Sequence, residues 1–304
     1  MDHSSLRRSL LLAAVAGPFV AACAPTGVAH DRARAVALQL QALEQSAHGR
    51  LGVAALDTSN GARLAYRSRE HFPLCGTFTV VAVAALLTRA ALDPTLLPRR
   101  VLYRRYDLVP DSPVTNSHAD TGLTVAQLCE AALQAGDQSA ANMVMDLLGG
   151  PAVVTEFAHS IGDTTFRLDR WEPELNTARP GDLRDTGTPV ATADTLRRLL
   201  LGNTLPDAQR AQLQAWMLGN AGGAAGGVAG GMAGIRAGLP SDWRVAHVYG
   251  AGGYGTTNDI AVVWPPSRAP LVLAIYFTQP AADAAPHDDV VASAARIVAA
   301  GFTG

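Results

Sequence analysis

Strand-like segments lie near both ends of this chain, and helical segments fill its middle. Residues 51–58 and 62–68 alternate apolar and polar side chains, and the Ser59-Asn60-Gly61 stretch between them is typical of a hairpin turn. Further strand-like segments follow one another near the C-terminus, at 243–250, 256–265 and 270–279. Strands bury their apolar faces by sharing a sheet, so this order predicts an α+β fold with one five-stranded antiparallel sheet built from both chain ends.

Helical periodicity marks most of the remaining chain. Residues 30–48 and 287–301 carry the apolar spacing of helices that would flank the sheet. More such segments fill the middle, at 77–90, 124–134, 138–148, 151–161, 191–202 and 206–217. We therefore expect one domain over residues 24–304, with an α/β part at 30–67 and 217–304 and an inserted all-helical part at 68–216. A cleft between two such parts is a natural ligand site.

Composition excludes several classes of function. The chain has 304 residues, 48% of them hydrophobic, which is ample for a large core. Its 24 basic and 26 acidic residues leave a formal charge of −2, so no nucleic-acid partner is expected. No cysteine or histidine spacing indicates a metal site, and we expect neither metal nor cofactor. Residues 219–234 are a low-complexity Gly/Ala stretch without the phosphate-binding loop pattern, which favours a flexible loop.

The N-terminus predicts export. Residues 1–23 run from a short basic stretch containing Arg7 and Arg8 into an apolar stretch too short to span a membrane. Val20-Ala21-Ala22-Cys23 resembles a lipoprotein cleavage box, and the arginine pair resembles a twin-arginine signal. We expect a periplasmic protein, either anchored to the membrane through lipidated Cys23 or cleaved nearby without a lipid. Cys75 and Cys129 would remain as free, buried thiols.

Several long segments, in order, carry a family resemblance. Residues 167–189 (RLDRWEPELNTARPGDLRDTGTP) resemble the Ω-loop of the class A serine β-lactamases almost unbroken, and 253–266 resemble the strand after that family's third motif. LCEAALQ and SAANMVMDLLGGP, within 128–151, and IRAGLPSDW at 235–243 resemble further family segments. The resemblance covers nearly the whole chain and includes the Pen-type enzymes of Burkholderia. It implies the serine β-lactamase/transpeptidase fold and an antibiotic-resistance family that hydrolyses β-lactam amides.

The family's chemical positions hold other residues here. The Ser-x-x-Lys pair falls on Gly76 and Thr79, and the Ser and Asn of Ser-Asp-Asn fall on Gly136 and Gln138. The Lys-Thr-Gly motif falls on Val248, Tyr249 and Gly250, so both lysines and both serines are replaced.

The substrate cleft also departs from the family. The two sites of the family's carboxylate-anchoring arginine fall on Gly234 and Thr257, and its aromatic gatekeeper falls on Asp111. This arginine and the lysine of the third motif, the two cationic anchors that the resemblance implies for the substrate carboxylate, are thus both missing, and Asp111 adds a negative charge. Binding of penicillins is expected to be weak.

The frame of the Ω-loop is retained. Glu172 matches the hydrolytic carboxylate and Asn176 its water-holding partner. Arg170 and Asp185 match the ion pair that clamps the loop, and the bond before Pro173 is cis in the family. Without the neighbouring lysine, a partly buried Glu172 should have a raised pKa.

These substitutions predict a catalytically disabled homologue, because a glycine has no side chain with which to attack a carbonyl. On this hypothesis the chain is a monomeric pseudoenzyme, not an enzyme, that binds a small ligand, a cell-wall peptide or a partner non-covalently. One alternative is an active β-lactamase that works through an unexpected group. The candidates for that group are Thr77, Cys75 and the His247/Tyr249 pair. Another is an envelope module that binds peptidoglycan peptides.

Overall fold

A five-stranded antiparallel sheet forms the centre of the protein. The computed structural model describes residues 27–220 and 234–303. The strands lie in the order β2-β1-β9-β8-β7. Their bounds are β1 Arg50–Asp57, β2 Arg63–Tyr66, β7 Arg244–Gly252, β8 Thr256–Trp264 and β9 Leu271–Thr278. β9 pairs with β1 on one side, Leu51 opposite Phe277, and with β8 on the other. The predicted fold class is confirmed.

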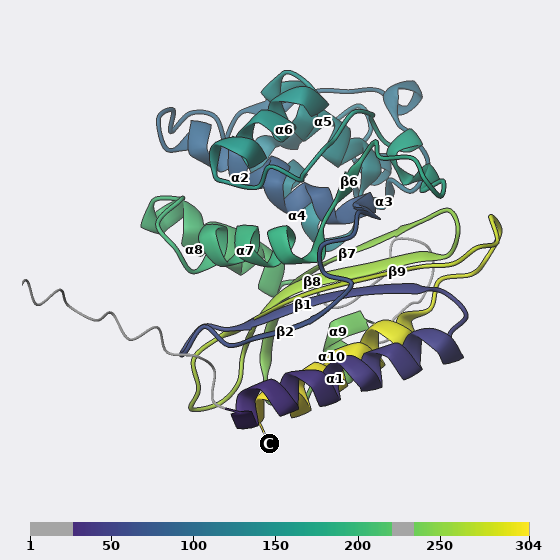
Figure 1. Ribbon diagram of the computed structural model, residues 1–304. Coiled ribbons are helices and arrows are strands. Elements are labelled where there is room, and N and C mark those ends of the chain that lie inside the picture. Colours follow the sequence, from purple (N-terminus) through teal and green to yellow (C-terminus); the bar gives the residue numbers. More distant parts are fainter. Residues whose placement is uncertain (1–26, 221–233, 304) are drawn as a thin grey trace, which may run out of the picture.

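Helices cover both faces of the sheet (Figure 1). The terminal helices α1 (Gly27–Ser46) and α10 (Asp288–Thr303) lie together on one face with the short α9 (Gly234–Gly238). Successive strand residues point to opposite faces, so Leu273 and Ile275 join the core under these helices while Val272 and Ala274 join the core of the other face. Covered on both faces, β8 and β9 are apolar over most of their length.

The all-helical part packs on that second face. Its elements are α2 (Thr79–Ala90), α3 (Pro113–Ser117), α4 (Val125–Gln134), α5 (Gln138–Leu148), α6 (Pro151–Ser160), α7 (Pro189–Leu200) and α8 (Asp207–Leu218). Most of α2 is buried, which fits a helix that is apolar all round. The one-turn helix η1 (Cys75–Phe78) leads directly into α2 from the short β3 (Phe72–Pro73).

Short elements connect the larger ones. β3 pairs with β6 (Thr186–Gly187), and β4 (Arg100–Val101) pairs with β5 (Leu123–Thr124). The one-turn helix η2 (Arg105–Asp107) precedes α3, and η3 (Glu174–Thr177) lies within the Ω-loop segment. These elements hold the loops that reach the sheet edge at β7.

Most elements lie where the sequence predicts them. The β1–β2 hairpin turns through Gly61 at φ +76°, a left-handed conformation that glycine adopts without strain. Cys75 and Cys129 are free and buried, as predicted. Residues 1–23, with Cys23, and most of the 219–234 stretch lie outside the described residues. Among residues 27–220 and 234–303, no helix is both long and apolar enough to cross a membrane.

Candidate active site

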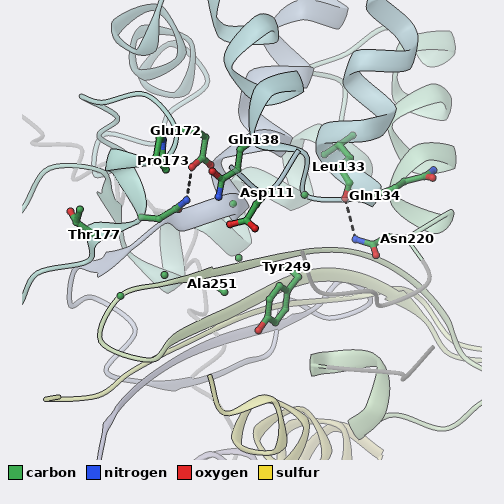
Figure 2. A pocket seen from close by; sticks show the side chains of 16 residues that line it. Asp111, Leu133, Gln134, Gln138, Glu172, Pro173, Thr177, Asn220, Tyr249 and Ala251 are labelled. Atoms are coloured by element: carbon green, nitrogen blue, oxygen red, sulfur yellow. Dashed lines mark hydrogen bonds between the residues drawn. The ribbon is translucent and has the colours of Figure 1, made fainter. Parts of the chain in front are cut away.

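A pocket of about 410 Å³ opens where the helical part meets the edge strand β7. Its walls come from η1, the loop before α3, the α4–α5 junction, the Ω-loop and β7. The lining residues are Gly76, Asp111, Leu133, Gln134, Gly136, Gln138, Glu172, Pro173, Asn176, Thr177, Asn220 and Tyr249–Gly253. Figure 2 shows the polar side chains of Asp111, Gln138 and Glu172 gathered above β7. The structure therefore brings together residues from six separate segments, the sixth being the chain after α8 at Asn220.

The Ω-loop wall is fixed by a buried carboxylate. Asp185 Oδ1 accepts hydrogen bonds from the backbone N–H groups of Asp169 (2.7 Å) and Arg170 (2.9 Å). Asp185 Oδ2 accepts from Arg170 Nε over 2.5 Å. The same guanidinium donates through Nη1 to Thr177 Oγ1 at 2.9 Å. These bonds tie both ends of the loop to its centre, which holds Glu172 in place.

Glu172 is held by its backbone as well as by its side chain. Its N–H donates to Asn142 Oδ1 and its carbonyl oxygen accepts from Asn142 Nδ2, both over 2.9 Å. The Nδ2 amide of Asn176 donates to Glu172 Oε2. The peptide bond between Glu172 and Pro173 is cis. The carboxyl group therefore has a fixed position at the pocket wall.

Burial controls the ionisation of Glu172. The residue is 4% exposed, and desolvation of its charged form raises the pKa to about 8. The bond from Asn176 opposes this shift, whereas the negative charges of Asp185, Asp111 and Glu174 add to it. The raised pKa expected from the sequence has burial as its main cause.

The α4–α5 junction supplies a second wall. Gly136 adopts φ +60°, and the next residue, Asp137, caps α5 by accepting from the Ala140 N–H at 2.8 Å. Asp137 also accepts from the N–H groups of Val114 and Thr115. Asp111 is bonded directly to this junction, because its carbonyl oxygen accepts a hydrogen bond from the Gln138 N–H over 3.1 Å. Fully bonded Asp137 thus positions both walls without lining the pocket.

β7 closes the pocket with backbone more than with side chains. Gly250 passes so close to η1 that a Cβ there would lie 2.8 Å from the Gly76 nitrogen. Although Tyr249 lines the pocket, its ring lies on the other side of β7 from Glu172 and Asp111 (Figure 2). Burial and a hydrogen bond to Asp288 of α10 raise the pKa of its phenol. The phenol of Tyr249 therefore points away from the carboxyl groups of the pocket.

Some predicted site residues lie away from the pocket. Thr79 is buried and donates from Oγ1 to the Gly76 carbonyl, and Val248 packs into the core between the sheet and the helical part. The hydroxyl of Thr257 donates to the Gly255 carbonyl and accepts from the His287 N–H. Gly234 begins α9, and a Cβ there would clash with the Asp259 carboxylate. None of these four residues is among the described residues that line the pocket.

The alternative catalytic groups named from the sequence, Thr77, Cys75 and His247, also lie outside the described pocket lining. Thr77 is buried and donates from Oγ1 to the Leu74 carbonyl over 2.6 Å. Cys75 is fully buried, and desolvation raises the pKa of its thiol, which keeps it protonated. His247 is buried on the far face of β7 with Asp259, 3.0 Å from Nδ1 to Oδ1.

Asn142 is the functional-site residue that sequence reasoning missed. It lies four residues after Gln138 on α5, so the two share a helix face. That spacing was the available signal, but an asparagine on a helix face is not distinctive by itself. Its two bonds to the Glu172 backbone appear only in the folded chain.

Comparison with known proteins places this geometry in a family. A model described as "Beta-lactamase enzyme family" matches residues 35–302. The chain belongs to the class A β-lactamase family. Two curated relatives, β-lactamase OXY-1 of Klebsiella oxytoca and β-lactamase Toho-1 of Escherichia coli, are each 48% identical over 99% of this chain and 100% of their own length.

Solved structures agree with this assignment. A β-lactamase from Burkholderia vietnamiensis is 63% identical, with a TM-score of 0.82 over 87% of this chain and 98% of that one. A variant of a class A β-lactamase reconstructed for the last common ancestor of Gram-negative bacteria is 52% identical, with a TM-score of 0.83 over 88% and 98% of the two chains.

These comparisons contradict the prediction of a catalytically disabled homologue. Relatives that match the whole chain at 48% identity are named β-lactamases, which favours the alternative of an active β-lactamase. The prediction of a non-enzymatic ligand- or partner-binding protein is therefore wrong. That prediction inferred the loss of catalytic activity from the residue types at a few motif positions. A pocket can also activate water through groups that those positions do not include.

Proposed function

We propose that this protein hydrolyses β-lactam rings with a water molecule that Glu172 activates directly. One observation carries the proposal: a buried carboxyl group with a pKa near 8 lines the same pocket as Gly76. A carboxyl group with a pKa close to the working pH is suited to take and return a proton. Gly76 supplies no side chain, so the attacking oxygen on this route is that of water.

The other lining groups support a water route. Among the described lining residues, the hydroxyls belong to Thr177, which accepts from Arg170, and to Tyr249, whose ring faces away. No serine, cysteine, lysine or histidine lines the described part of the pocket. Glu172 is therefore the lining group best placed to act as a base.

The reaction balances with water as the only co-reactant. The water oxygen bonds to the lactam carbonyl carbon while one water proton passes to the Glu172 carboxylate. The carbon–nitrogen bond of the ring then breaks, and Glu172 returns the proton to the ring nitrogen. Gly76 lies in the one-turn helix η1 that leads into α2, where backbone N–H groups favour the negative charge that develops on the carbonyl oxygen.

Paired variants test this function. Wild-type protein at high concentration is incubated with a β-lactam at pH 8.5, and the ring-opened product is measured by mass spectrometry. Glu172→Gln should abolish turnover, whereas Glu174→Gln, two residues away and exposed, should retain it. Absence of turnover in the wild type, or equal turnover in both variants, would overturn the proposal.

A second measurement tests the route. Single turnover in ¹⁸O-labelled water should place one label in the new carboxyl group, with no covalent adduct in the intact protein mass. An acyl adduct on any side chain would overturn direct attack by water and would identify the nucleophile.

We also propose export of this enzyme, with Cys23 as its lipid acceptor and a monomer as its working form. The lipoprotein-like box at 20–23 and the basic, apolar leader support this. Labelling with a fatty acid should mark the wild type and not Cys23→Ala. Label in both, or in neither, would contradict lipidation at this residue. Light scattering of the mature chain should give the monomer mass, and a dimer mass would contradict the proposed form.

A further inference from the structure

The ionisable side chains in the described lining of the pocket are all acidic. Its described lining carries two carboxyl groups, on Asp111 and Glu172, and no lysine, arginine or histidine. Any charge that the lining presents to a ligand is therefore negative.

Arg170, a basic side chain that contacts this lining, is paired with acidic groups. Arg170 contacts the lining residue Thr177 through Nη1, but its Nε pairs with the buried Asp185 and its Nη2 lies 4.0 Å from Asp182. The charge of Arg170 is thus compensated mainly by Asp185, because Asp182 pairs more closely with Arg184. A carboxylate in the pocket would find no unpaired cation among the described lining residues.

Asp111 is placed to act on the ligand. It is exposed at the pocket wall, in a left-handed conformation at φ +54°. Its carboxylate is close enough to Glu172 to raise the pKa of that residue. A charge that acts on Glu172 from the pocket wall also acts on a ligand in the pocket, attracting cations and repelling anions.

We propose that this pocket selects lactams that carry an ammonium group and rejects those that carry a carboxylate. This selection names a substrate class for the proposed hydrolysis. The reaction with these lactams rests on that proposed function, whereas their binding does not. Recognition follows from the Asp111 carboxylate and the absence of a compensating cation from the described lining, because Glu172, with a pKa of about 8, is mostly protonated at neutral pH. It can therefore be measured without turnover.

Unreactive ligands separate recognition from hydrolysis. Three γ-lactams, whose five-membered rings resist hydrolysis, would be identical except for an aminomethyl, a carboxamide or a carboxylate group. Their equilibrium binding to the wild type is measured by calorimetry at pH 6.5 and low salt. The ammonium compound should bind at least tenfold more tightly than the carboxylate compound, and 0.5 M salt should reduce this ratio.

Matched variants assign the effect. Asp111→Asn tolerates the left-handed conformation and should reduce the ammonium preference at least fivefold. Glu174→Gln removes an exposed carboxylate outside the pocket lining and should leave the preference unchanged. Equal or tighter binding of the carboxylate compound would overturn the proposal, as would no binding of the ammonium compound at millimolar concentration. Because γ-lactams are not turned over, failure of the hydrolysis test leaves this result interpretable.

Discussion

The side-chain amide of Asn176 donates a hydrogen bond to Oε2 of Glu172, which lies four residues earlier on the same loop. This bond stabilises the carboxylate form, against burial and the charges of Asp185, Asp111 and Glu174, which favour the protonated form. The balance between them sets the pKa near 8. Asn176 is therefore a positioning residue whose loss changes a measurable ionisation.

Asn176→Ala should raise the pKa of Glu172 further, by about 0.5–1 unit, because a bond to the charged form is lost. The carboxyl carbon of Glu172 can be followed by ¹³C NMR between pH 5 and 10. The exposed Glu174 serves as an internal control whose titration should not move. An unchanged or lowered pKa of Glu172 would contradict this account.

The rate of hydrolysis should rise with pH through about 8. The active base is the carboxylate, and with a pKa of about 8 only roughly a tenth of Glu172 is ionised at pH 7. The rate should therefore increase close to tenfold per pH unit below 7 and level off above 9. Initial rates in constant-ionic-strength buffers measure this. A rate that is flat or falling between pH 6 and 9 would exclude Glu172 as the base.

Stability should change with pH in the opposite direction. The folded-state pKa of Glu172 is raised above its ordinary value of 4.5, so the native chain holds a proton that the unfolded chain releases. The contribution is complete below about pH 4.5 and is lost as the pH rises through 8, an effect on the order of a few kcal/mol. Thermal unfolding from pH 6 to 9 should show a falling Tm in the wild type. Glu172→Gln, a neutral isostere, should show a flatter profile, and parallel profiles would contradict the assignment.

Asp185→Asn should destabilise the protein by about 3 kcal/mol, because it breaks a buried ion pair and leaves the Arg170 guanidinium facing an amide. Chemical denaturation gives the free energy of unfolding. Asp169→Asn changes a half-buried carboxylate on the same loop, paired with the exposed Arg167, and should cost under about 1 kcal/mol. Equal losses in the two variants would show that the clamp is not specific.

Asp137→Ala should cost about 3 kcal/mol or more, because its fully buried carboxylate accepts from three backbone N–H groups and the Thr115 hydroxyl. Asp146→Ala, an exposed change on the same helix, should cost under about 0.5 kcal/mol. Denaturation midpoints measure both. A loss below about 1 kcal/mol for Asp137→Ala would contradict a structural role.

Local patterns in the sequence predicted the sheet, the hairpin and most helices. Alternation and helical spacing are properties of neighbouring residues, and Gly61 needs only its own turn to adopt a positive φ. Glu172 and Asn176 could be identified because they lie within one long segment of family-like sequence. The inference of a disabled enzyme rested on the replaced motif residues, and it is contradicted by relatives that match the whole chain and are named β-lactamases.

The tertiary structure decided what the pocket contains. Alternation along β7 separates Val248 from Tyr249, but only the packing of α10 shows that the phenol faces away from Glu172. Asn142 reaches Glu172 across 30 residues of chain. The raised pKa of Glu172 comes from burial by several segments at once. The sequence thus determined which helices and strands form. Solvation and charge at the site depend on which distant segments pack together around it and exclude water.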